Sequence, residues 1–165
     1  MNIRSLPARL GIGYDAHRFG ARRRLMLGGV YIPSRPGLEG HSDADVLLHA
    51  VCDALLGAVA LGDIGRHFPN SSRRYKNIPS LKLLARVREM LRRRGYTVGN
   101  IDVTVILERP KIARYAGRMI RNIARTLNIQ PSQVSVKATT NERMGFIGRG
   151  DGCAALAIAY VFPPE

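Results

Sequence analysis

The chain has 165 residues and is 45% hydrophobic, which is enough to form the core of one domain of ordinary size. Its formal charge of +14 at pH 7 suits anionic partners such as nucleic acid, acidic lipid or phosphorylated small molecules, with a merely solvated basic surface as the alternative. No apolar run approaches the roughly 20 residues of a spanning helix, and no Cys-x-x-Cys pair occurs. The composition therefore excludes a helical membrane protein and a cysteine-rich zinc module.

Strand and helix patterns alternate along the chain. Strands are predicted at residues 10–19, on either side of Gly28-Gly29, and at 96–107, 134–138 and 153–162. Helices are predicted at residues 44–61, 81–94 and 112–127, with loops that include 37–40 and 63–80. Helices between strands favour an α/β fold of the α+β two-layer kind, a mixed sheet with helices packed on one face. Because few helices accompany this much strand, the other face is free for another subunit.

The helix over 44–61 carries the most informative polar residues. Ser42 is its candidate N-cap, and Asp45, His49 and Asp53 follow at four-residue spacing, which places the three on one stripe. The rest of the segment is apolar nearly all round, as expected of a buried helix. Two carboxylates and an imidazole in apolar surroundings are costly unless something pairs with them, and a bound cation is one such partner. The stripe therefore points to a metal site.

The strand over 10–19 can complete that site. Asp15 and His17 are two residues apart, so both side chains lie on the same face of a strand. Together with His49 they form a natural three-ligand set, and a tetrahedral zinc so bound keeps its fourth position open for substrate. Asp45 or Asp53 would then orient the imidazole. The alternatives are a surface Asp-x-His pair and a core histidine with ordinary hydrogen bonds.

Two loops carry residues suited to phosphate. His41-Ser42-Asp43, at a helix start, can bind an anion or a substrate hydroxyl, and a simple N-cap is equally supported. In Lys137–Glu142 (KATTNE), two hydroxyls and a carboxylate could meet phosphate oxygens and a magnesium ion, although the residues alone favour a polar strand end and a turn. No nucleophilic triad or Walker loop can be argued, and the 10 aromatic residues show no stacking pattern for RNA.

Taken together, five segments resemble the 2-C-methyl-D-erythritol 2,4-cyclodiphosphate synthase family of the non-mevalonate isoprenoid pathway. The segments are GIGYDAHRF, LGGVYIP, HSDADVLLHAVCDALLGAVALGDIGRHFP, GYTVGNIDVTVILERPKI and VSVKATTNERMGFIGRGDG. Five in the right order and spacing are highly specific, and the match runs from about Leu10 to Val161. We expect residues 1–165 to form a single catalytic domain, with 1–9 outside the family match.

The resemblance implies roles for individual residues. Zinc would be held by Asp15, His17 and His49, and a second divalent ion, Mg²⁺ or Mn²⁺, by Glu142. Asp45 and Asp53 become supporting groups. The methylerythritol phosphate end of the substrate would meet His41, Ser42, Asp63, Ile64, Gly65, Phe68 and Asn70. The cytidine and phosphate end would meet Lys111, Ala138, Thr139, Thr140, Asn141, Glu142, Phe146 and Arg149. Candidate catalytic residues are His41, Asp63 and Thr140.

The resemblance also implies a reaction and an assembly. In a CDP-linked alcohol, the 2-phosphate attacks the β-phosphorus and CMP leaves, so that no protein nucleophile is required. Family members are homotrimers whose sheets face a central threefold axis, with sites between subunits. The axial cavity could hold an isoprenoid diphosphate, and Arg149 and Asp151 would lie near it. We expect no nucleic acid or membrane partner and a bacterial cytoplasmic location, with a processed plastid form as the alternative.

Three residues depart from the family pattern. Asn70 and Ser72 stand where Asp is common, and Asp151 stands where Glu is frequent. The rival functions are a zinc-dependent phosphohydrolase that uses the same ligands to activate water, and a nucleic-acid-binding module built on the basic surface.

Overall fold

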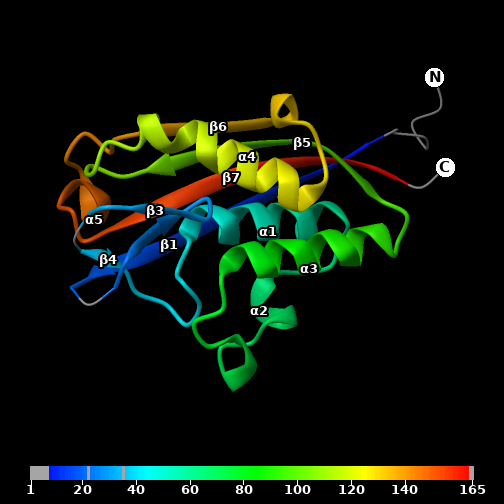
Figure 1. Cartoon of the computed structure of the whole chain (residues 1–165), viewed down its shortest axis with the longest axis horizontal. Coiled ribbons are helices and arrows are strands. Elements are labelled where there is room, and N and C mark those ends of the chain that lie inside the picture. Colours follow the sequence, from blue (N-terminus) through cyan, green and yellow to red (C-terminus); the bar gives the residue numbers. More distant parts are fainter. Residues whose placement is uncertain (1–7, 22, 35, 164–165) are drawn as a thin grey trace.

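The computed structural model describes residues 8–21, 23–34 and 36–163. Within these residues, five strands form a mixed sheet in the order β4-β1-β7-β5-β6 (Figure 1). Their bounds are β4 Gly37–Leu38, β1 Arg9–Gly20, β7 Gly152–Phe162, β5 Thr97–Ile106 and β6 Val134–Thr139. β1 and β5 both run antiparallel to the central β7, whereas β5 and β6 are parallel. The predicted mixed sheet is confirmed. A separate hairpin pairs β2 (Leu25–Leu27) with β3 (Val30–Ile32), as the Gly28-Gly29 turn predicted.

Three long helices cover the sheet: α1 (Val46–Ala58), α3 (Ser80–Arg92) and α4 (Ala116–Leu127) (Figure 1). α1 is almost entirely buried, and it packs between β1 and β7 on one side and α3 on the other. The core also takes alternate residues of β5, namely Ile101, Val103 and Val105. Because α1 is held between the sheet and α3, its residues have fixed positions relative to β1 and β7. The described residues contain no helix with the length and hydropathy that a membrane crossing requires.

Large apolar side chains of β1 and β7 lie exposed on the face of the sheet away from α1. Ile12 on β1 is 66% exposed, and its register partner Ile158 on β7 is 46% exposed. Leu10, Tyr14 and Leu156 are exposed beside them. A single copy of the chain therefore leaves a broad apolar surface in contact with water.

The apolar helix predicted at residues 44–61 is shorter than expected: it begins two residues later and ends three residues earlier. Its first residue is Val46, because Ala44 has a φ of +57°, which a right-handed helix cannot include. The prediction that Ser42 is the N-cap of this helix is therefore wrong. The carboxylate of Asp45 accepts the N–H of Leu48 and is the actual cap. Helix α1 ends at Ala58, four residues before Gly62.

Several segments predicted as loop contain short elements. β4 occupies Gly37–Leu38, α2 covers Ile64–His67, and α5 covers Gly145–Gly148. The third predicted helix opens with a 3₁₀ turn at Ala113–Tyr115 before α4. These elements are too short to leave a periodic pattern in the sequence.

Candidate metal centre

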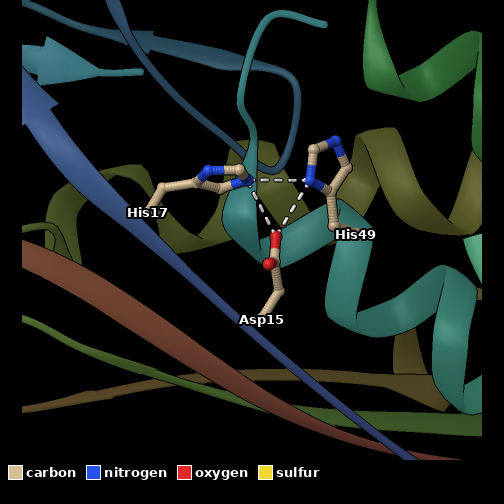
Figure 2. Close-up of side chains that lie close together, drawn as sticks. All are labelled: Asp15, His17 and His49. Carbon is tan, nitrogen blue, oxygen red and sulfur yellow. Dashed lines mark hydrogen bonds and ion pairs between the residues drawn. The ribbon is translucent and has the colours of Figure 1, made fainter. Parts of the chain in front are cut away.

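Asp15, His17 and His49 point at one another (Figure 2). The first two stand on the same face of β1, and His49 projects from α1. Asp15 Oδ2 lies 3.0 Å from His17 Nε2 and 2.9 Å from His49 Nδ1, and the two nitrogens are 3.1 Å apart. The expected three-ligand set is therefore brought together, and its oxygen and nitrogen donors could hold a metal ion.

Glycines on β1 allow α1 to come this close. Gly13 lies on the same face as Asp15, and a Cβ built there would be 2.0 Å from the carbonyl oxygen of Ala50. A Cβ on Gly11 would be 2.0 Å from the carbonyl oxygen of Ala54. The backbones of the strand and the helix are therefore in direct contact. This contact sets the distance between Asp15 and His49.

Charge is concentrated at the triad. Burial alone would raise the pKa of Asp15, but hydrogen bonds and charge from His17 and His49 outweigh it and hold that pKa well below its usual range. Burial would lower the pKa of His49, whereas its hydrogen bond to Asp15 raises it above the ordinary value. The carboxylate thus stays ionised in a half-buried position, which is the state that a cation requires.

The outer nitrogen of the His49 ring faces two hydroxyls. His49 Nε2 lies 3.0 Å from Ser42 Oγ and 3.0 Å from Ser80 Oγ. Ser42, expected to contact substrate, thus places its hydroxyl on the imidazole. Ser80 was missed by the sequence analysis, although Pro79-Ser80 before an apolar run is a recognisable helix start.

Asp45 and Asp53 do not orient the imidazole, and that prediction is wrong. Asp45 accepts the backbone N–H groups of Gly28 and Gly29 at 2.9 and 2.7 Å. Asp53 accepts the N–H of Ile64 at 2.7 Å. Both carboxylates instead fasten neighbouring segments to α1, because the stripe that they share with His49 continues past the metal centre on either side.

A cavity of about 200 Å³ opens beside the triad. It gathers most of the residues expected at the methylerythritol phosphate end: His41, Ser42, Ile64, Gly65, Phe68 and Asn70. Asp63 does not line it and instead caps α2 by accepting the N–H of Arg66 at 3.0 Å. Tyr75, Ile78 and Leu83 supply an apolar wall that sequence reasoning did not identify.

A second cavity, of about 1000 Å³, contains part of the set expected at the cytidine end. Lys111, Thr140 and Arg149 line it, together with Arg109 and Arg143. A third cavity, of about 750 Å³, has Phe146, Arg149 and His17 in its wall. The first two cavities share no lining residue, and the third borders both, through His17 on one side and Arg149 on the other. Ala138, Thr139, Asn141 and Glu142 line none of the three cavities.

The loop after β6 is held by a carboxylate that the sequence analysis did not single out. Glu108 Oε1 accepts the N–H of Asn141 at 3.0 Å and that of Arg143 at 3.1 Å. Within this loop Thr140 Oγ1 donates to Glu142 Oε1 at 2.6 Å, and Glu142 has a φ of +50°. The expected hydroxyl and carboxylate therefore lie side by side at the end of β6.

Arg149 and Asp151, both expected near the axial cavity, form an ion pair. Arg149 Nε lies 3.1 Å from Asp151 Oδ2, so the shorter aspartate still reaches the guanidinium. Asn70 lies in the cavity wall beside the triad, and Ser72 accepts a hydrogen bond from His41 Nε2 through its carbonyl oxygen at 3.1 Å.

Comparison with known proteins agrees with the geometry. The model of the YgbB family matches residues 8–162. A 2-C-methyl-D-erythritol 2,4-cyclodiphosphate synthase of Pelodictyon phaeoclathratiforme is 58% identical over 93% of this chain and 98% of its own length. The protein of that name from Chlorobium luteolum is 60% identical over the same shares.

Solved structures extend the likeness to the whole fold. IspF of Plasmodium falciparum in complex with CDP superposes with a TM-score of 0.84 at 35% identity, over 96% of this chain and 97% of that one. The bifunctional IspDF of Campylobacter jejuni has a TM-score of 0.92 at 41% identity, over 96% of this chain and 43% of that one. The family match covers almost all of the described residues, and the chain belongs to the YgbB family.

Proposed function

We propose that this chain converts 4-diphosphocytidyl-2-C-methyl-D-erythritol 2-phosphate into 2-C-methyl-D-erythritol 2,4-cyclodiphosphate and CMP. It is then a phosphorus–oxygen lyase of the non-mevalonate isoprenoid pathway, like the relatives that match over 93% of the chain. The observation that carries the proposal is the triad of Asp15, His17 and His49 at the wall of a cavity.

The triad suits zinc. Zn–N and Zn–O bonds of about 2.1 Å in a tetrahedral site place neighbouring donor atoms about 3.4 Å apart. The three donor atoms are 2.9–3.1 Å apart, so they would need to widen only slightly. Three ligands leave a fourth position for a substrate oxygen. When bound there, zinc supplies positive charge that polarises the β-phosphate.

The rest of the chain would position the substrate. An oxygen of the 2-phosphate forms a bond to the β-phosphorus, the bond from that phosphorus to the bridging oxygen breaks, and CMP leaves with the electron pair. Because both groups belong to one molecule, orientation can lower the barrier by several kcal/mol, up to roughly 7–11 in ideal cases. The proposed contacts on the attacking side are His41, Ser42, Asp63, Ile64, Gly65, Phe68 and Asn70.

The nucleotide side of the site is proposed around the second cavity. Lys111 and Arg149 supply positive charge there, and Thr140 supplies a hydroxyl. Ala138, Thr139, Asn141 and Phe146 are proposed as further contacts. Glu142, hydrogen-bonded to Thr140, is the proposed ligand of a second ion, Mg²⁺ or Mn²⁺. His41, Asp63 and Thr140 are proposed as catalytic residues, since each would lie against the reacting phosphates.

A homotrimer would unite the two groups of contacts. The first two cavities have no lining residue in common and are bordered jointly only by the open third cavity, whereas one substrate must reach both. The apolar face that includes Ile12 and Ile158 is available to pack against other copies. Packing of that face around a threefold axis would bring the nucleotide side of one subunit to the triad of the next.

Product analysis tests the function. With the CDP-linked substrate, zinc and magnesium, phosphorus NMR should show equal amounts of CMP and a cyclic diphosphate. Open-chain phosphate products formed with consumption of water would instead establish a phosphohydrolase. His49→Ala should lose both zinc and turnover, whereas His67→Ala, whose ring hydrogen-bonds the Leu61 carbonyl oxygen outside the triad, should keep stoichiometric zinc. Stoichiometric zinc in His49→Ala would contradict the ligand assignment.

A further inference from the structure

Three side chains, His49, Ser80 and Asp43, form a hydrogen-bonded chain that leads away from the metal centre. His49 Nε2 lies 3.0 Å from Ser80 Oγ, and Ser80 Oγ lies 2.5 Å from Asp43 Oδ1. The second carboxylate oxygen of Asp43 accepts the backbone N–H of Ser80 at 3.1 Å. Ser80 is fully buried and His49 is 7% exposed, so water does not compete for the contact between these two side chains. Asp43 thus holds Ser80 at two points.

The direction of each hydrogen bond follows from which groups can donate. An ionised carboxylate can only accept, so the hydroxyl hydrogen of Ser80 goes to Asp43. The 2.5 Å separation is typical of such a charge-assisted O–H···O⁻ bond. The oxygen of Ser80 then has only lone pairs to offer His49, so the ring nitrogen Nε2 must carry a hydrogen.

The hydroxyl of Ser42, the second one at the ring, does not by itself decide whether Nε2 of His49 carries a hydrogen. Ser42 Oγ also lies 3.0 Å from His49 Nε2, and it accepts the N–H of Ala44 at 3.1 Å. Its own hydrogen has no carboxylate partner and can turn toward the ring. Ser42 can therefore serve either tautomer, whereas Ser80 with Asp43 serves only one.

We propose that Asp43 and Ser80 are positioning residues that fix His49 as the Nε2–H tautomer and so direct the lone pair of Nδ1 at the metal. The inference rests on the metal centre of the proposed function. Neither residue touches metal or substrate, and both act through the imidazole. Partners that orient a histidine ligand in this way typically contribute 10- to 100-fold to metal affinity.

The test compares zinc affinity in two variants with matched controls. Ser80→Ala and Asp43→Asn should each weaken zinc binding about 10- to 100-fold in competition with a chromophoric chelator. Ser132→Ala removes an exposed serine hydroxyl, and Glu89→Gln removes a partly exposed carboxylate, paired with Arg92 and Arg93, on the helix that Ser80 begins. Both controls should bind zinc like the wild type. Circular dichroism and thermal unfolding identify any variant that has lost its fold.

A spectroscopic measurement separates tautomer control from general loosening. In ¹⁵N-labelled, zinc-loaded protein, the ring nitrogen shifts of His49 should report hydrogen on Nε2 alone. Asp43→Asn offers Ser80 an amide hydrogen and frees its hydroxyl, so in the folded, zinc-loaded variant the Nε2 shift of His49 should move to that of a weaker hydrogen bond, whereas Glu89→Gln should leave it unchanged. Wild-type zinc affinity and ring shifts in both variants would overturn the proposal while leaving the metal centre intact. Failure of the wild type to bind zinc would overturn the metal centre and, with it, this inference.

Discussion

The carboxylate of the buried Asp45 accepts the backbone N–H of Gly29, 16 residues away along the chain, at 2.7 Å. The same side chain holds Gly28 and caps α1 at Leu48. Gly28 and Gly29 have φ values of +58° and +69°, the conformation of a tight hairpin turn that glycine favours. Asp45 therefore joins the β2–β3 hairpin to the start of the helix that carries His49.

Asp45→Asn is expected to remove a pH-dependent part of the stability. Burial, reinforced by the charge of Asp43, raises the pKa of Asp45 from 3.8 to about 6, although three backbone N–H groups oppose the rise. The folded protein therefore binds a proton at Asp45 more readily than the unfolded chain does. Above pH 6 the folded protein bears the whole cost of burying an ionised Asp45 carboxylate. Below about pH 4 the carboxyl is protonated in both states and this cost disappears. The free energy of unfolding should therefore gain about 3 kcal/mol from Asp45 at the lower pH.

Urea unfolding of metal-free wild type and Asp45→Asn at pH 7 and pH 4, at one protein concentration, measures this contribution. Other groups, such as Asp15, titrate alike in both proteins, so their effects cancel in the difference. The unfolding free energy of the wild type relative to the variant should increase on acidification. An equal difference at the two pH values would show that Asp45 keeps an ordinary pKa.

Gly13→Ala should disrupt the metal centre through the backbone. The new Cβ would meet the carbonyl oxygen of Ala50 at 2.0 Å and the nitrogen of Ala54 at 2.6 Å, so α1 must move away from β1. We expect a loss of about 3 kcal/mol or more in the free energy of unfolding, together with weaker zinc binding.

Gly57→Ala is the matched control for this change. Gly57 lies in α1 itself, is exposed, and has only the carbonyl oxygen of Ile12, at 3.8 Å, near the added Cβ. Alanine there should stabilise the helix by about 0.5–1 kcal/mol and leave zinc binding unchanged. Similar effects of the two substitutions on stability and zinc affinity would show that the strand and helix are not in tight contact.

The ligand triad could be predicted because each part obeys a local rule. Alternation along a strand puts Asp15 and His17 on one face whatever the strand packs against. His49 is one of few polar residues in a helix that must be buried, so its ring needs a partner nearby. Only the meeting of the strand with the helix is non-local, and the small residues Gly11 and Gly13 make it possible.

The groups around the triad could not be predicted, because their partners come from distant segments. Ser80 is 31 residues from His49, and Gly29 is 16 residues from Asp45. The start of α1 was predicted wrongly for another reason. Ala44 adopts a left-handed φ, and no residue near it in the sequence indicates this conformation. Asp45 therefore does not orient the imidazole as predicted. It caps α1 and accepts hydrogen bonds from the turn of the β2–β3 hairpin.

Ile158→Arg should separate the subunits if the apolar face packs around a threefold axis. Ile158 is 46% exposed beside Ile12, so one chain alone tolerates an arginine there, whereas a buried interface does not. Light scattering after size exclusion should show a trimer for the wild type and a monomer for the variant. Zinc binding should persist, because the triad lies on the other face of the sheet, but turnover should fall to background.

Tyr31→Arg provides the control for that experiment. Tyr31 is 49% exposed on the separate β2–β3 hairpin. The substitution therefore adds the same charge at an exposed large side chain, but outside the five-stranded sheet. It should remain trimeric and active. A wild type that is monomeric and fully active would contradict the proposed assembly, as would a trimeric Ile158→Arg.

Glu142→Gln should weaken the response to magnesium without affecting zinc. The Glu142 carboxylate accepts the hydroxyl hydrogen of Thr140 at 2.6 Å and lies outside the zinc triad. Glutamine keeps the acceptor oxygen for Thr140 but removes the negative charge that a hard divalent cation requires. The magnesium concentration for half-maximal turnover should therefore rise about tenfold or more, with zinc content unchanged. Glu89→Gln, which removes a partly exposed carboxylate on α3, should titrate like the wild type. A Glu142→Gln titration that overlays the wild type would mean that the second ion is held elsewhere, since no other change in the variant could compensate for the lost charge.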